Sequence, residues 1–274
     1  MARVLGCRGS ARGRGSPHGG CRLNFHGWQW CLAALGALLV GVSKTGITGL
    51  SLIFVSIFAG IMPARRSTGL VMPLLFIGDI VAVLSYRRHA QWHHVWRLLP
   101  WAGVGVVIGY FALGRMDERQ ARFAIGAIVL GLAALYIGRR LRRGADEAVH
   151  AAWFAPAIGI LAGFTTLVAN AAGPLTVIYL LAMRLPKMEY MGTTAVFFFL
   201  LNIFKAPFMI SLGLITRESL AANLLLAPAV LLGSWLGRWL LVRINQRVFE
   251  NIVLALALVA GAGDVYLTAP SWLR

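Results

Sequence analysis

Apolar segments recur along almost the whole chain, and this pattern limits the fold more than any other feature. A run of about 20 apolar residues is long enough to cross a bilayer as a helix. Because 59% of the 274 residues are hydrophobic and only 13% are charged, the sequence predicts an all-α polytopic membrane protein with about eight to ten helical segments. The segments begin near Trp28, Gly46, Gly69, Leu98, Arg122, Ala151, Ala171, Met191, Leu220 and Ile252.

Some of these segments are too short for a complete crossing. They hold only about a dozen apolar residues and are interrupted by glycine, whereas a full span needs about 20. In membrane proteins, short segments with such interruptions are typical of broken or re-entrant helices. We expect them in the first two segments of each half, at 28–62 and 151–184.

The second half of the membrane region repeats the first. Asp79 falls on Asn202 at an offset of 123 residues, which also aligns the turns at 63–69 and 186–192. Three further pairs follow at an offset of 128: Pro100, Gly105 and Gly109 with Pro228, Gly233 and Gly237. We therefore predict two pseudo-symmetric repeats, and five crossings in each would invert one repeat relative to the other.

The composition divides the chain into four parts. Residues 1–26 are rich in Arg, Gly and Ser and contain little that can be buried, so they predict a disordered basic N-terminal tail. We place the first membrane repeat at 27–138, a charged linker at 139–150 and the second membrane repeat at 151–268.

The net charge of +17 would suggest a nucleic-acid partner in a soluble protein. Here the basic residues lie between apolar segments, where they orient a membrane protein and favour the cytoplasmic side. The expected partner is therefore the lipid bilayer rather than nucleic acid, and the expected location is the cell inner (plasma) membrane. The loops assigned to the cytoplasm contain Arg87, Arg88, Arg97, the run 139–143, Arg184, Lys187, Arg238, Arg243 and Arg247.

The first candidate site is the glycine-flanked stretch at 41–49, which contains Ser43, Lys44, Thr45 and Gly46. Unwound backbone with free N–H groups binds anions, the lysine adds positive charge, and the hydroxyls donate hydrogen bonds. An ionisable residue inside a membrane segment is a functional hypothesis by default. The alternative is an interfacial turn whose lysine reaches to water.

The second candidate site occupies the equivalent position in the second half. Asn170 is an isolated amide between apolar stretches, and Gly173 followed by Pro174 is expected to interrupt a helix. Thr165, Thr166 and Asn170 are able to donate hydrogen bonds to an oxyanion. The alternative is a helix-packing contact made by small and polar residues.

The third candidate site is Asn202 with Lys205, together with the repeat partner Asp79, all deep in apolar segments. A buried lysine requires a partner or a hydrated cavity, so Lys205 is a candidate for neutralising an anionic substrate. Asp79 is a candidate for carrying a coupled proton or for pairing with Lys44 or Lys205. The alternative is a purely structural ion pair.

Catalysis and metal binding have little support in the sequence. The three cysteines form no C-x-x-C pair, and no combination of nucleophile, base and acid points to an enzyme. His89 and His93 have a metal-compatible spacing, but the neighbouring Trp92 and Trp96 indicate a membrane interface. We expect no enzyme activity, no metal and no cofactor.

The candidate stretches are similar to the TauE/SafE family of membrane transporters, also called the sulfite exporter family, from about Trp28 to Leu267. The likeness is carried by VGVSKTGITG at 40–49, RRHAQW at 87–92, GFTTLVANAAGP at 163–174, YLLAMRLPKMEYMGT at 179–193, NIFKAPF at 202–208, LGLITRESL at 212–220 and the turns at 63–69 and 192. The resemblance implies two related halves and transport of sulfite, sulfonates or related anions. Many members have three glycines where this chain has Lys44, Thr45 and Gly46.

The expected function is secondary transport of a small anion such as sulfite or an organosulfonate. Substrate would bind where the broken segments of the two halves meet, and one half would rock against the other. Two other functions remain open at this point. A non-transporting accessory or assembly protein would lack a polar cavity at mid-depth, and an anion channel would have a continuous polar pore.

Overall fold

The computed structural model describes residues 27–48, 50–62, 64–113, 153–170 and 172–268. Within these residues the chain forms nine α-helices, one short 3-10 turn and no strand, so the all-α prediction is confirmed. The elements are α1 (Gly27–Thr45), α2 (Ser51–Ile61), α3 (Ala64–Tyr86), η1 (Arg87–His89), α4 (Trp92–Leu113), α7 (Phe154–Ala169), α8 (Gly173–Ala182), α9 (Lys187–Ser211), α10 (Arg217–Arg243) and α11 (Gln246–Thr268). The predicted tail, linker and segment near Arg122 lie outside the described residues.

Four of the described helices are long and apolar enough to cross a membrane. They cover Ser67–His89, Trp92–Ala112, Lys187–Ser211 and Arg217–Arg243, with mean hydropathies of 1.4 to 2.0. Large apolar side chains point outward from them, for example Leu84 and Leu224, which are 69% and 77% exposed. In a membrane these outward-facing apolar side chains contact lipid, so they do not have to be buried against other protein.

The predicted short segments form two helical hairpins. Hairpin 1 consists of α1 and α2, and hairpin 2 consists of α7 and α8. The second helix of each is only 11 or 10 residues long, about half of what a crossing requires. In hairpin 1 the two helices lie side by side, because Gly36 leaves room for the ring of Phe58. Each hairpin has a tip between its two helices, bordered by Gly46 and Leu50 in hairpin 1 and by Asn170 and Ala172 in hairpin 2.

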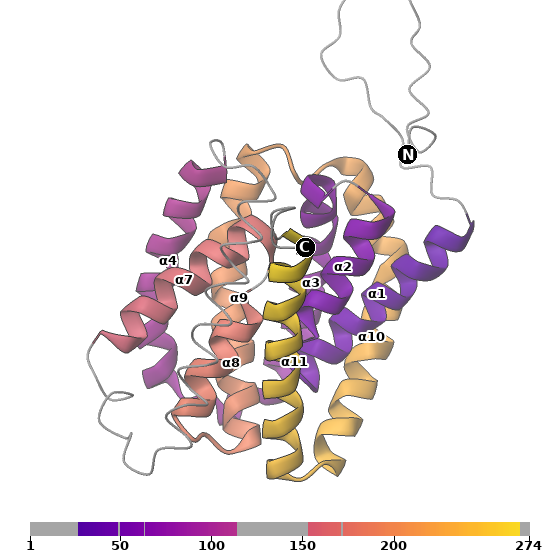
Figure 1. Cartoon of the computed structure of the whole chain (residues 1–274). Helices are drawn as coiled ribbons and strands as arrows, with labels where there is room; N and C mark the ends of the chain where they lie inside the picture. The colour runs from indigo at the N-terminus through magenta and orange to yellow at the C-terminus, as the bar shows by residue number, and fades with distance from the viewer. Residues whose placement is uncertain (1–26, 49, 63, 114–152, 171, 269–274) are drawn as a thin grey trace, which may run out of the picture.

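The two hairpins enter the bundle from opposite ends. Lys187 donates to the carbonyls of Leu241 and Ile244 at 3.1 and 2.6 Å, and Gly192 contacts Ala90. The turns 86–92, 183–187 and 243–246 therefore share one end, which we call the basic end. Gly69 contacts Leu214, which places 62–64 and 212–216 at the opposite end. Hairpin 1 returns to the opposite end and hairpin 2 to the basic end (Figure 1).

Each hairpin is fastened to a long helix by close helix contacts. Helix α1 packs along α10, and α7 packs along α4. At the first crossing a Cβ on Gly41 would overlap the backbone of Val230, and at the second a Cβ on Gly163 would overlap that of Ala102. Small residues allow such close approach between membrane helices. In the predicted repeat, α1 corresponds to α7 and α4 corresponds to α10. The α1–α10 crossing is therefore the counterpart of the α7–α4 crossing.

Helices α3 and α9 run antiparallel through the centre of the bundle, since α3 ends and α9 begins at the basic end. Asp79 and Asn202, the residues aligned by the repeat, meet there through a direct hydrogen bond. This arrangement is the one that an inverted duplication predicts. The division into repeats at 27–138 and 151–268 stays a prediction, because part of each boundary lies outside the described residues.

Candidate functional site

The two hairpin tips and helix α9 enclose a small polar cavity. Its free volume is about 30 Å³, which is room for about one or two water molecules. Most of the lining side chains are polar, and Phe54, Leu75 and Phe198 are apolar. The cavity is lined by Ser43, Lys44, Thr48, Ser51, Phe54, Leu75, Thr166, Asn170, Gly173, Thr194, Phe198 and Asn202.

Lys44 is the charged residue in the cavity wall. It lies in the last turn of α1, where a cation is stabilised by the negative end of the helix dipole. Its Nζ atom lies 2.7 Å from Oδ1 of Asp79 and 4.4 Å from the ring centre of Phe198. The Lys44 side chain is 11% exposed, whereas that of Asp79 is completely buried. The cation therefore faces the cavity, and the carboxylate lies behind it.

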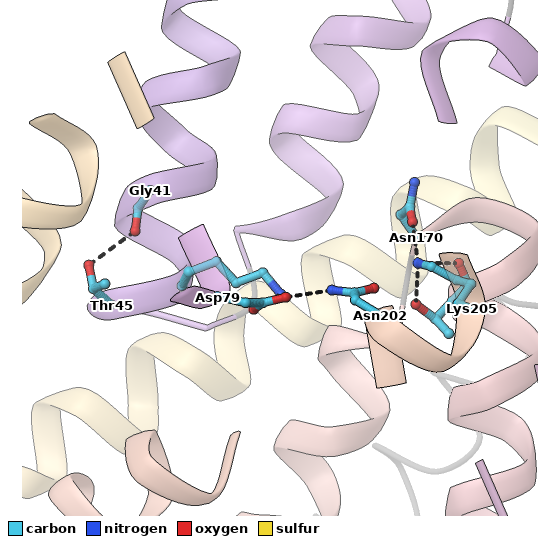
Figure 2. A network of polar contacts seen from close by, with 8 residues as sticks. Gly41, Thr45, Asp79, Asn170, Asn202 and Lys205 are labelled. Carbon is cyan, nitrogen blue, oxygen red and sulfur yellow. Dashed lines mark hydrogen bonds and ion pairs between the residues drawn. The ribbon is translucent and has the colours of Figure 1, made fainter. Parts of the chain in front are cut away.

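Asp79 is held from two sides. Lys44 of α1 pairs with one carboxylate oxygen, and Nδ2 of Asn202 donates to the other at 2.5 Å (Figure 2). The sequence left open whether Asp79 pairs with Lys44 or with Lys205, and in the structure its ion-pair partner is Lys44. Because Asn202 belongs to α9, this chain of contacts connects hairpin 1 to both central helices.

Lys205 has a different environment. It is completely buried and does not line the cavity. Its Nζ donates to Oδ1 of Asn170 at 2.8 Å and to the hydroxyl and carbonyl oxygens of Thr166 at 3.2 and 3.3 Å (Figure 2). All three acceptors are neutral and lie at the end of α7. Lys205 therefore holds the end of this helix, where a cation also interacts favourably with the helix dipole.

Asn170 forms the turn of hairpin 2. Its backbone is left-handed, with φ of 53°, a conformation that asparagine adopts more readily than most residues. Its side chain accepts from Lys205 and donates through Nδ2 to the carbonyl of Thr68 on α3 at 3.3 Å. This single residue therefore ends α7, lines the cavity and ties hairpin 2 to α3.

Two helix N-termini meet at the cavity. Helix α2 begins at Ser51 and α8 begins at Gly173, and a Cβ on Gly173 would lie 2.7 Å from Oγ of Ser51. The first N–H groups of a helix have no partner within it and form the positive end of its dipole. These two positive helix ends therefore face the same cavity as Lys44, whose charge is paired with Asp79 behind it.

Three polar atoms at the cavity have no hydrogen-bond partner. They are Oγ of Ser51, Oγ1 of Thr194 and Oδ1 of Asn202. Leaving a buried polar group unpaired costs free energy, so native proteins rarely keep several of them together without a ligand or water. Two of the three are hydroxyls, which are able to donate to an anion.

Thr45 and Gly46 lie away from the cavity, unlike Ser43, Lys44, Asn170, Gly173 and Asn202. The hydroxyl of Thr45 donates to the carbonyls of Ser234 at 2.6 Å and of Gly41 at 3.1 Å. Gly46 contacts Gly237. Both residues therefore hold α1 against α10. Substrate binding at these two positions stays a prediction, and the observed contacts are those of helix packing.

Five polar or aromatic lining residues were not identified from the sequence: Thr48, Ser51, Phe54, Thr194 and Phe198. Ser51 is the first residue of the short helix α2 and follows Gly49 by two positions in the sequence. Thr194 and Phe198 lie four residues apart on α9 and so share one face of the helix. Threonine and phenylalanine are common in buried membrane helices, so only packing reveals that this face borders the cavity.

A multi-pass helical bundle with oppositely directed hairpins and a small cavity lined by polar residues between their tips is the arrangement expected of a membrane transporter. Comparison of the sequence with known families agrees with this class. The profile of the family described as Sulfite exporter TauE/SafE matches residues 33–263, and the chain belongs to this family.

A curated relative is described as "Probable inner membrane transporter protein TsaS" of Comamonas testosteroni. It is 28% identical over 215 residues, which cover 76% of this chain and 84% of the relative. No solved structure matches the chain with significance.

Proposed function

We propose that the protein transports a small anion through the cavity between the two hairpin tips. The observation that carries this proposal is the convergence of Lys44, the N-termini of α2 and α8 and two unpaired hydroxyls on one enclosed space. Positive charge, helix N-termini and free donors are the groups that bind an oxyanion. The substrate-binding set is Ser43, Lys44, Asn170, Gly173 and Asn202 from the sequence, extended by the two unpaired hydroxyls of Ser51 and Thr194.

The substrate is sulfite or a small organosulfonate. The family description names sulfite, and the sulfonate group presents the same oxygens to hydroxyl and N–H donors. Phe54, Leu75 and Phe198 form an apolar side of the cavity, which suits the carbon portion of a sulfonate. The relative's name places that protein in an inner membrane, and we propose the same location for this chain.

The small size of the cavity favours a transporter over a channel. A volume of about 30 Å³ is too small for an oxyanion, so the hairpins must separate before substrate binds. Movement of one half of the bundle against the other would expose the cavity to each side in turn. A channel requires a continuous polar pore, and an accessory protein has no need of buried cations around a cavity.

Asp79 is the candidate for coupling transport to protons. It is completely buried and neutralises Lys44. Protonation of Asp79 would release Lys44 to an anion, so that proton and anion would move together. Uptake by proteoliposomes with and without an imposed proton gradient tests this coupling. The wild-type rate should follow the gradient, and that of Asp79→Asn should not.

The main test is transport by the purified protein in proteoliposomes. Radiolabelled sulfite and a small labelled sulfonate should enter faster than in empty liposomes, with a labelled neutral sugar as the control solute. Lys44→Met should abolish the difference, whereas Lys187→Met, which removes a lysine at the basic end, should leave uptake near the wild-type rate. Equal exclusion of every anion tested would contradict the proposed function.

A further inference from the structure

The tip of hairpin 1 reaches across the bundle to two tyrosines near the basic end. Tyr86 is the last residue of α3, and its hydroxyl donates to the carbonyl of Thr45 at 2.7 Å. Tyr190 lies in the first turn of α9, and its hydroxyl is 2.7 Å from that of Thr48. Both tyrosines are almost completely buried. The tip that enters from one end is therefore fastened at the other.

Thr48 separates the cavity from Tyr190. It lines the cavity, and its hydroxyl contacts Tyr190, whose ring packs edge-on against Phe249 of α11 at 5.2 Å between ring centres. The Thr48–Tyr190 contact therefore lies between the cavity and the basic end of the bundle.

The tip of hairpin 2 makes the corresponding contact in the other direction. It enters from the basic end, and the Asn170 side chain donates to the carbonyl of Thr68, in the second turn of α3 at the opposite end. Asn170 also lines the cavity. Each tip thus borders the cavity and contacts a residue near the end from which it did not enter.

We propose that Thr48 and Tyr190 form the gate toward the basic end, and that Asn170 and Thr68 form the gate toward the opposite end. This inference rests on the proposed transport function, because it assigns the two steps of substrate release to two different sets of residues. Opening one gate while the other stays closed exposes the cavity to one side of the membrane only. Tyr190 and Thr48 are positioning residues of transport rather than groups that bind the anion's charge.

The test measures access to the cavity from each side without any substrate. The native cysteines Cys7, Cys21 and Cys31 are replaced by serine, and Ser51→Cys places one thiol in the cavity wall. A charged, membrane-impermeant methanethiosulfonate is then added to right-side-out or inside-out vesicles. Two exposed marker positions, Arg88→Cys at the basic end and Ser211→Cys at the opposite end, identify which end each preparation presents.

Loss of the Thr48–Tyr190 contact should open only one route. Tyr190→Phe and Thr48→Val are each expected to raise the rate of labelling from the basic end by about fivefold, the factor that one buried hydrogen bond supplies. Labelling from the opposite end should not rise. The double variant should be no faster than either single variant, because both remove the same contact.

Two further variants complete the design. Asn170→Gly keeps the left-handed backbone and removes the side chain, so it should raise labelling from the opposite end alone. Tyr110→Phe removes a tyrosine hydroxyl from α4 that belongs to neither proposed gate, and it should change neither rate. If Tyr190→Phe fails to elute as a folded protein on gel filtration, Thr48→Val, a nearly isosteric change, tests the same contact.

Two results would overturn the gate assignment: unchanged labelling in both Thr48→Val and Tyr190→Phe, or an equal increase from both ends, which indicates general loosening. The transport assay remains separate. If no anion is transported but labelling is one-sided, the proposed substrate is wrong and the gates stand. If anions are transported but labelling shows no sidedness, the gates are wrong and the transport function stands.

Discussion

Hairpins 1 and 2 have the same backbone plan but place their positive charge differently. Hairpin 1 contains its own cation, Lys44, which lines the cavity and pairs with Asp79 behind it. Hairpin 2 has no charged residue between 154 and 182, and its cation comes from α9. That residue, Lys205, is buried against neutral acceptors on α7. The comparison supports the proposal that Lys44 binds substrate, whereas Lys205 holds the turn of hairpin 2.

The two hairpin turns are also stabilised by different chemistry. In hairpin 1 the carbonyl of Thr45, at the end of α1, accepts from the phenol of Tyr86 on α3. In hairpin 2 the carbonyl of Thr166, near the end of α7, accepts from the ammonium of Lys205 on α9. The Thr45 carbonyl lies at a helix end, where carbonyls lack partners within the helix, whereas the Thr166 carbonyl also accepts from the backbone N–H of Asn170 at 3.0 Å. The last turn before each tip is thus held by a neutral donor in one half and by a cation in the other.

The largest effect is expected for Lys44→Met, which leaves Asp79 buried without a counter-charge. Breaking a buried pair from one side destabilises a protein by about 3–5 kcal/mol, and thermal unfolding in detergent measures the loss. Lys44→Met combined with Asp79→Asn removes both charges and should recover most of the stability. Transport by the double variant should stay absent, since the cavity has lost its cation. Recovery of transport would show that the pair is only structural.

A smaller effect is expected for Lys205→Met. It removes the hydrogen bonds to Thr166 and Asn170, and bonds to a charged group contribute about 1.5–3 kcal/mol. Because Lys205 does not line the cavity, the maximal transport rate should fall while KM stays within about twofold of wild type. Concentration-dependent uptake separates the two parameters. A large rise in KM with an unchanged maximal rate would place Lys205 in direct contact with substrate and remove the distinction between the hairpins.

The smallest effects concern the two crossings that anchor the hairpins. Gly41→Ala and Gly163→Ala each introduce a methyl group against a neighbouring backbone, and overpacking of this kind destabilises by about 1–3 kcal/mol. Gly60→Ala is the matched control, because nothing lies within 4 Å of a Cβ at that position. Melting temperatures should fall similarly for the first two variants and not for the third. A fall for only one of them would mean that the hairpins are anchored unequally.

Much of the architecture could be predicted because a bilayer restricts the length and polarity of the segments that cross it. Apolar runs of spanning length indicated membrane helices, and the short runs at 28–62 and 151–184 indicated interrupted ones. Lys44, Asn170 and Asn202 stood out as polar residues in apolar surroundings, and the structure places all three at one cavity. Such residues are conspicuous because an unpaired polar group in hydrocarbon is expensive.

The sequence was a poorer guide to which individual residues line the cavity and which pack against neighbouring helices. Thr45 and Lys44 are neighbours, yet a helix turns about 100° per residue, so Lys44 faces the cavity and Thr45 faces α10. Thr48 and Tyr190 are 142 residues apart and meet only after the hairpin has crossed the bundle. Threonine is a common residue in membrane helices, and only the position of Thr194 on α9 places it at the cavity.

The sequence alone determined that this chain is a helical membrane protein with interrupted segments in two corresponding places. The reason is that apolar length and isolated polar residues act locally against the fixed thickness of the bilayer. Only the tertiary structure decided which lysine borders the cavity, which one supports a hairpin, and which of the two pairs with Asp79. Those relations depend on how helices far apart in the chain pack and rotate against one another, and no local pattern specifies that rotation.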